Sequence, residues 1–558
     1  MLKKNYKPRV FVILIFFLIL YFIILARFLL IQVYKKDFFE NLAKQQYETE
    51  LKLTQPRAKI YDIYKEPLAL NFDVTSVFIL PRQFSEKEKT QKFLKKYFKN
   101  VYEKIFDKNK KFLWVERNLP QERLDWFKKF DLKDLYFINE PLRYYPFNSM
   151  STIIGFTDID NVGIAGIELI FNKQLAGLPS TVKLEQDARS GHFYFEKEIL
   201  QEGQKGELVQ LTIDSKLQFL VYDEVKKAVE QYEAKSGSAI ILDPESGYIF
   251  AMANYPDFDP NKKNIENIEN TKNRIVTECY ELGSVFKTFT ALAALEEHVT
   301  TSDELIDCEG KVAYIDKFRV ENWKSTGIVP FYFVIQNSSN IGIAKIAKRL
   351  GPKLYEHLVR LGFSKKTGIN FPGERSGFVN PPQNWSRPSV ITMSFGYEIS
   401  ATLMQLAKAF GIIANDGYDF DPVLTLPAYD EQASKTGRAH EKLYSDKAIT
   451  DLKNILQNIG DHYNQGLQDY RVMGKTGTAR AVKNGKYSRL DHVYSFGGII
   501  EKNNYKRVIV TFIQEPKGAG WWASQITAPL FNRIAQKMVI NDLTHKKTVH
   551  VVVSGKVS

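Results

Sequence analysis

Three short motifs on this chain carry the residue types needed for acyl transfer through a serine. In chain order they are Ser284-Val285-Phe286-Lys287, Ser338-Ser339-Asn340 and Lys475-Thr476-Gly477-Thr478. They supply a nucleophile, a lysine base one helical turn later, a polar relay and a cationic strand that can bind an anion. The chemistry that they favour is attack of a serine hydroxyl on a carbonyl, with an acyl-serine intermediate.

Each residue of this set has an expected role. A serine hydroxyl is a poor nucleophile at neutral pH, so Ser284 needs a base, and Lys287 projects from the same face of a helix. Burial and the charge of Lys475 would lower the pKa of Lys287 and leave it neutral part of the time. We expect Ser338 to pass a proton towards the leaving amine and Asn340 to hold a substrate amide.

The strand that carries Lys475 is expected to supply the substrate contacts. An extended peptide can lie along the edge formed by Thr476, Gly477 and Thr478. The hydroxyls of the two threonines would bind a terminal carboxylate, and the backbone N–H groups of Ser284 and Thr478 would form an oxyanion hole. The eight histidines show no ligand spacing, so we expect no metal site and no cofactor.

Each motif alone is a weak signal, because the chain repeats two of them elsewhere. Ser180-Thr181-Val182-Lys183 fits the first motif, and Lys366-Thr367-Gly368 and Lys435-Thr436-Gly437 fit the third. Context separates the copies. Ser284 opens an apolar run that predicts a buried helix, and Lys475 lies in strand-like sequence, whereas the competing copies lie in loops or turns. The ordered triple therefore predicts one site.

A regular pattern of strands and helices surrounds these motifs from Glu207 onward. The expected elements are a helix from Ser215 to about Ala234, a hairpin of strands 239–242 and 248–252, strands 493–500 and 507–513, and a helix from about Ala528 to Val539. Strands from both ends of this region thus bracket a helical middle that holds Ser284 and Ser338. We expect an α+β fold with an antiparallel sheet between helical layers.

The N-terminal segment predicts a membrane anchor. Lysines and Arg9 precede an uncharged apolar run from Val10 to Ala26, and the apolar character resumes after Arg27. The segment is long enough to cross a bilayer once, and its positive flank predicts a cytoplasmic N-terminus with the bulk of the chain outside. A cleaved signal peptide is the alternative, although no small-residue cleavage pattern follows.

Length and charge bound the remaining possibilities. A chain of 558 residues is too long for one ordinary core. We expect an anchor at 1–34, an elongated α/β pedestal domain at 35–206, a catalytic domain at 207–541 and a tail at 542–558. The formal charge of +13 is dispersed among acidic residues without an aromatic-basic groove motif, which argues against nucleic acid as a partner. Cys279 and Cys308 would form either a disulfide or two independent buried thiols.

Further segments give the chain a resemblance to a known family. They are Gln55–Asp62, Ile154–Thr157 and Gly163–Glu168 in the pedestal, and Asn273-Arg274, Gly283-Ser284, Ser338–Gly342 and Lys475–Ala479 in the catalytic domain. With them the chain resembles the monofunctional, class B penicillin-binding proteins, the D,D-transpeptidases that cross-link peptidoglycan. The segments Glu281–Lys287 and Gly474–Arg480 and the compact ending are most similar to the division-specific septal branch.

The resemblance implies a substrate and partners. The donor would be a stem peptide ending in D-Ala-D-Ala, Ser284 would expel the terminal D-Ala, and an amine of a neighbouring stem would complete the cross-link. β-Lactams would acylate the same serine. Partners would be a polytopic glycan polymerase and single-pass division proteins of the bacterial inner membrane, in septum formation and cell shape. Ala58, Leu282 and the segment Phe395–Glu398 depart from the family pattern.

Three alternatives stay open. The chain could be an elongation-type transpeptidase of the same family, a β-lactam sensor or β-lactamase with a similar triad, or a scaffold whose catalysis is dispensable. Asn340 stands where class D β-lactamases have valine, and no Glu-x-x-Leu-Asn motif of class A lies between the second and third motifs. Both observations argue against a β-lactamase.

Overall fold

A computed structural model of the chain describes residues 7–40, 48–53, 55–107, 109–110, 112–186, 193–262, 264–426, 441–483, 485–518 and 522–554. The chain divides into two units, each assembled from several segments. The first comprises residues 1–56, 73–142 and 177–205, and the second comprises 57–72, 143–176 and 206–558. Of the competing motif copies, Lys435-Thr436-Gly437 lies outside the described residues.

The N-terminal helix α1 (Lys7–Leu29) continues into a π-helical turn, η1 (Leu30–Tyr34). Together they form a 28-residue span that contains an 18-residue stretch of mean hydropathy 3.0, and it is long and apolar enough to cross a membrane. Within the described ranges no other helix meets that test. Its apolar side chains are exposed on every side, which is typical of a helix whose neighbour is lipid. The predicted helix of membrane-spanning length is confirmed, and its orientation stays a prediction.

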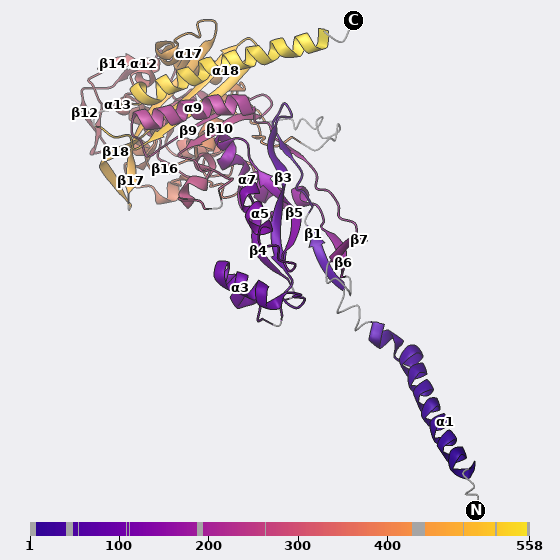
Figure 1. The fold of residues 1–558 in the computed structure, drawn as a ribbon. Coiled ribbons are helices and arrows are strands. Elements are labelled where there is room, and N and C mark those ends of the chain that lie inside the picture. The colour runs from indigo at the N-terminus through magenta and orange to yellow at the C-terminus, as the bar shows by residue number, and fades with distance from the viewer. Residues whose placement is uncertain are drawn as a thin grey trace, which may run out of the picture. The chain divides into compact units, whose positions relative to one another are not determined.

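The first unit contains a three-stranded sheet, part of a five-stranded sheet and a helical lobe (Figure 1). Strands β1 (Glu48–Leu53), β6 (Ser180–Gln186) and β7 (Phe193–Gln201) form one antiparallel sheet. The end of β3 (Pro67–Ile79) pairs with β4 (Leu113–Leu119) and β5 (Tyr136–Tyr144). Helices α3 (Lys87–Tyr97), α4 (Lys99–Lys104) and α5 (Gln121–Lys128) pack on these strands through a core that includes Val77, Ile79, Phe93 and Phe127.

The second unit is built on a five-stranded antiparallel sheet with strand order β10-β9-β19-β18-β17. The strands are β9 (Ser236–Leu242), β10 (Ile249–Tyr255), β17 (Arg471–Lys483), β18 (Lys486–Lys502) and β19 (Tyr505–Gln514). The predicted hairpin is thus the pair β9–β10, and β17 forms one edge. The expected α+β fold with an antiparallel sheet is confirmed.

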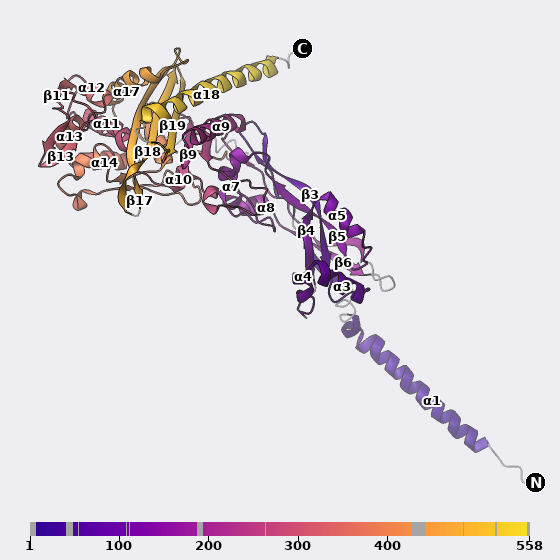
Figure 2. The same ribbon diagram turned by 60° about the vertical axis from the view of Figure 1, so that its left-hand side comes forward.

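Both faces of this sheet are buried, because successive side chains of a strand point to opposite sides. Ile240 and Leu242 belong to one core cluster, whereas Ala239 and Ile241 belong to another. Helices α9 (Ser215–Gln231) and α18 (Ala523–Ser554) lie side by side over the second cluster (Figures 1 and 2). The final helix is therefore longer than the expected Ala528–Val539.

The helices on the opposite side of the sheet belong to the other core cluster; some of them contact the strands, and the rest pack on those helices. They are α10 (Arg274–Thr277), α11 (Lys287–Glu296), α12 (Phe331–Gln336), α13 (Asn340–Leu350), α14 (Lys353–Arg360), α15 (Ser389–Met393), α16 (Leu403–Ala414) and α17 (Asp446–Gly460). A 3₁₀ turn, η4 (Gly283–Phe286), leads into α11. The small hairpin of β12 (Val312–Ile315) and β13 (Phe318–Glu321) packs against α13.

Two segments of the family resemblance, Gln55–Asp62 and Gly163–Glu168, meet in a buried ion network. Arg57 Nη2 lies 2.6 Å from Glu168 Oε2, and Arg143 Nε lies 2.6 Å from Glu168 Oε1. All three side chains are fully or almost fully buried. Because a buried charge is costly without a partner, each member holds the others in place. Segments more than 100 positions apart in the sequence are joined in this way.

Candidate active site

Ser284 lies in the 3₁₀ turn η4 rather than in the α-helix that the sequence predicts. The turn begins at Gly283, whose φ of +61° belongs to the left-handed region that favours glycine. Lys287 is the first residue of α11. Since residues three apart eclipse one another in a 3₁₀ turn, Ser284 and Lys287 still lie on one side.

Close backbone approaches fix the position of this turn. A Cβ atom on Gly283 would lie 2.2 Å from Thr478 O, and one on Gly477 would lie 2.4 Å from Leu282 O. On the other side, a Cβ on Gly396 would lie 2.3 Å from Gly283 O. The nucleophile turn is therefore held between β17 and the segment around Gly396 at distances that only glycine permits.

The side chain of Lys287 connects the first motif to the second. Its Nζ donates to Ser338 O at 2.6 Å, to Asn340 Oδ1 at 2.6 Å and to Ser338 Oγ at 3.1 Å. Across the described residues no hydrogen bond joins Ser284 Oγ to Lys287 Nζ. Catalytic hydrogen bonds are often long before substrate binds, so this arrangement is compatible with a base that engages the serine later.

Lys475 completes the cluster from the sheet edge. Its Nζ donates to Ser338 Oγ at 3.2 Å, so a single hydroxyl oxygen accepts from both lysines. Both lysine side chains are buried. The pKa of Lys287 is lowered well below its ordinary value, first by burial and then by the charge of Lys475. Burial lowers the pKa of Lys475 to about 8. Both shifts make proton loss easier than at an ordinary lysine, and at Lys287 the charge of Lys475 adds to the effect of burial.

The second motif adopts a backbone conformation that turns the polar atoms of Ser338 towards Lys287. Ser338 has a φ of +54°, which is uncommon for a residue other than glycine. Ser339 then caps α13, since its Oγ accepts from Gly342 N at 3.1 Å. The turn directs both the carbonyl and the hydroxyl of Ser338 at Lys287.

The third motif has the alternation of an edge strand. Lys475, Gly477 and Ala479 are buried, whereas Thr476 and Thr478 are half-buried and lie on the other face. β17 is paired only with β18 among the described strands, so its outer edge can accept another extended chain. The structure thus brings Lys287, Ser338, Asn340 and Lys475 into direct contact and places Ser284 and the two threonines beside them. The roles of these residues stay predictions.

Two acidic residues that the sequence did not single out support the nucleophile turn. Glu281 accepts from Glu398 N at 3.0 Å and from Tyr487 OH at 3.1 Å, and burial raises its pKa. Glu398, within the segment that departs from the family pattern, accepts from Asn380, Ser389 and Thr392. The departing segment is therefore tied to the turn through Glu281. Both residues lie in segments that the family resemblance marks, Glu281–Lys287 and Phe395–Glu398, but the sequence assigned neither of them a role.

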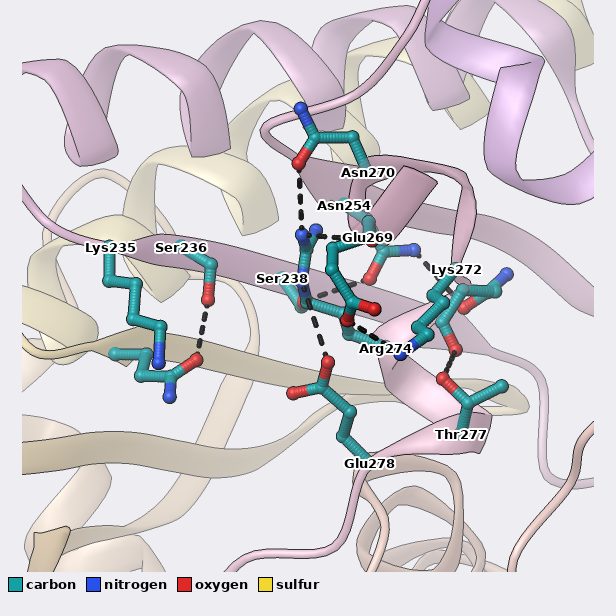
Figure 3. A network of polar contacts seen from close by, with 12 residues as sticks. Lys235, Ser236, Ser238, Asn254, Glu269, Asn270, Lys272, Arg274, Thr277 and Glu278 are labelled. Carbon is teal, nitrogen blue, oxygen red and sulfur yellow. Dashed lines mark hydrogen bonds and ion pairs between the residues drawn. The ribbon is translucent and has the colours of Figure 1, made fainter. Parts of the chain in front are cut away.

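A polar network precedes the nucleophile turn (Figure 3). Arg274 donates to Asn270 Oδ1 at 3.3 Å and pairs with Glu278, with 3.7 Å between Nε and Oε1. Asn254 Nδ2 donates to Asn273 Oδ1 at 3.1 Å. Because Asn254 belongs to β10, the Asn273-Arg274 pair links the sheet to the segment that leads to Ser284.

The two cysteines do not form a disulfide. Cys279 is half-buried and Cys308 is buried, and both are free thiols. Burial raises the pKa of each thiol. Of the two possibilities left open by the sequence, the structure has independent thiols.

Comparisons with known proteins agree with this geometry. Residues 237–536 match the family model described as Penicillin binding protein transpeptidase domain, and residues 52–211 match Penicillin-binding Protein dimerisation domain. Stage V sporulation protein D of Bacillus subtilis (strain 168) is 31% identical over 515 residues, which cover 88% of this chain and 79% of that protein. Peptidoglycan D,D-transpeptidase FtsI of Escherichia coli (strain K12) is 29% identical over 432 residues, 76% of this chain and 71% of that protein.

Solved structures share the fold. Penicillin binding protein 3 from Mycobacterium tuberculosis, complexed with aztreonam, has a TM-score of 0.65 at 23% identity, covering 88% of this chain and 97% of that chain. The chain belongs to the penicillin-binding protein transpeptidase family. With both domains present it is a class B penicillin-binding protein, and its enzyme class is serine-type peptidoglycan D,D-transpeptidase. The predicted family is confirmed, and the septal branch stays a prediction.

Proposed function

We propose that this transpeptidase cross-links stem peptides in septal wall synthesis, through an acyl-enzyme on Ser284. The observation that carries the mechanism is the contact of Lys287 with Ser338 and Asn340 in a buried setting beside Lys475. A buried lysine whose pKa is lowered can be neutral at physiological pH and can then accept a proton. The same group in solvent would stay charged.

The steps follow from this arrangement. A D-Ala-D-Ala stem extends along β17, with its terminal carboxylate at the hydroxyls of Thr476 and Thr478. Lys287 takes the proton of Ser284 as the serine oxygen bonds to the penultimate D-Ala carbonyl carbon. The oxyanion accepts hydrogen bonds from the backbone N–H groups of Ser284 and Thr478. Ser338 relays a proton to the amine of the departing D-Ala, and an amine of a second stem then attacks the ester.

Labelling with a fluorescent penicillin tests this assignment. The full-length protein in detergent should form a stable adduct that Ser284→Ala abolishes. Ser180→Ala is a matched control, because Ser180 belongs to the competing serine-x-x-lysine copy and its Oγ accepts from Gln55 in the first unit. Labelling that survives Ser284→Ala refutes the nucleophile. Rapid release of hydrolysed drug would instead favour a β-lactamase.

The septal role and the topology are further parts of the proposal. The sequence of Glu281–Lys287 supports the septal branch. The positive N-terminal flank supports a cytoplasmic N-terminus. Residues 35–206 would then form a pedestal and residues 207–541 the catalytic domain, both on the outer side of the membrane. We expect α1 and the pedestal to bind a polytopic glycan polymerase and single-pass division proteins. Depletion in the native cell should give filaments without septa. Rounded cells would favour the elongation alternative, and rescue by Ser284→Ala would favour a scaffold.

A further inference from the structure

One buried side chain outside the three motifs organises the second motif. Asn322 follows β13 and is 7% exposed. Its Oδ1 accepts three hydrogen bonds, from Asn340 N at 2.8 Å, Ile341 N at 3.1 Å and Ser339 Oγ at 3.1 Å. A helix leaves its first N–H groups without partners inside the helix. Asn322 therefore caps α13 from a different part of the chain.

The amide nitrogen of Asn322 anchors this cap. Nδ2 donates to Cys308 O at 3.3 Å and to Gly310 O at 3.4 Å. In addition, Asn322 N donates to Lys311 O at 2.9 Å. Because the nitrogen faces carbonyl oxygens, which only accept, the Oδ1 atom must face the helix. The side chain has one orientation that satisfies all its partners.

The neighbouring residue sets the orientation of the catalytic amide. Asn340 Nδ2 donates to Glu321 O at 2.7 Å, so its Oδ1 is turned to accept from Lys287 Nζ at 2.6 Å. Glu321 and Asn322 thus hold both the side chain and the main chain of Asn340. Loss of the Asn322 contacts would free the first turn of α13, which carries that amide.

We propose that Asn322 is a positioning residue for acylation, which acts by holding Asn340 where its amide meets Lys287 and the substrate. The proposal rests on the role assigned above to the second motif. Asn322 bonds the second motif and the residue after it rather than Ser284 or Lys287, and we infer that its effect on acylation passes chiefly through Asn340.

The test measures the second-order rate constant of acylation by a penicillin, per folded full-length protein in detergent, together with the thermal unfolding midpoint. Asn322→Leu keeps the size but removes both hydrogen-bonding functions, and we expect acylation to fall about 10- to 100-fold. Asn322→Asp keeps the acceptor atom that holds Asn340 but sets its second oxygen against Cys308 O and Gly310 O, so it should lower the unfolding midpoint and yet slow acylation less than Asn322→Leu does. Asn322→Ala replaces the leucine variant if that protein does not fold.

Two comparisons separate positioning from general stability. Asn261→Leu is the matched control, since Asn261 also bridges backbone groups, at Tyr145 N and O, and should lower the unfolding midpoint without changing acylation. In a protein that already carries Asn340→Ala, adding Asn322→Leu should lower the acylation rate constant by less than about 3-fold, because the side chain through which Asn322 acts has been removed.

An Asn322→Leu protein that acylates like wild type would overturn the proposal, and so would an equal loss in both backgrounds. An aspartate variant as slow as the leucine variant would overturn it too. Failure of the wild-type protein to acylate at Ser284 would instead refute the proposed function itself.

Discussion

Replacing Gly283 by alanine should slow acylation because it displaces the nucleophile, and this loss should exceed what backbone strain alone causes. The Cβ would lie 2.2 Å from Thr478 O, a separation that carbon and oxygen atoms do not tolerate. To restore an ordinary contact, the turn and β17 must separate by about 1 Å, and a displacement of that size at a reacting group costs on the order of 100-fold in rate. The positive φ adds about 1–2 kcal/mol of backbone strain.

The assay compares two glycine substitutions. Gly351→Ala is the control for backbone strain, because Gly351 has φ +55° and ψ −134°, a conformation essentially restricted to glycine, but a Cβ there meets nothing within 4 Å. Both variants bear the backbone strain, and only Gly283→Ala moves the nucleophile. We expect penicillin acylation to fall about 100-fold in Gly283→Ala and to stay near wild type in Gly351→Ala. Equal rates in the two variants would refute the reasoning, since the contact with β17 would then be irrelevant.

Two further outcomes follow from charge and burial. The rate constant of acylation should rise with pH as Lys287 loses its proton, at a pH well below the ordinary lysine pKa. It should fall again near pH 8 as Lys475 loses its charge. Lys475→Arg should remove this fall, because a guanidinium does not titrate in that range. A falling limb that persists in that variant would show that another group causes it. Glu168→Ala leaves two buried arginines without their carboxylate and should lower the free energy of unfolding by about 3–5 kcal/mol, whereas Glu269→Ala, at an exposed pair, should leave it close to the wild-type value. Thermal and denaturant unfolding measure both variants, and similar losses would contradict the argument.

Local patterns in the sequence were enough to predict several elements of the fold. The anchor helix, the β9–β10 hairpin, α9 and the strands β18 and β19 follow from runs and periodicities within about 20 residues, which depend on neighbouring positions only. The order of the three motifs likewise identifies the nucleophile candidate and its family. Element ends were less accurate: α18 begins at Ala523 because Ala523 and Ile526 pack into the core, which the apolar run from Ala528 did not indicate.

The remaining features depend on segments that meet only after folding. Lys287 contacts Ser338 across 51 positions, and its lowered pKa arises from a burial that no local pattern states. Asn322 has no motif around it, and its importance is visible only where β13 meets α13. Whether Cys279 and Cys308 form a disulfide also depends on folding, and in the structure both are free thiols. By itself the sequence determined which residues could react and in what order they occur. Their distances, orientations and protonation were decided by the tertiary structure. These properties depend on which distant segments pack together and bury the side chains away from water.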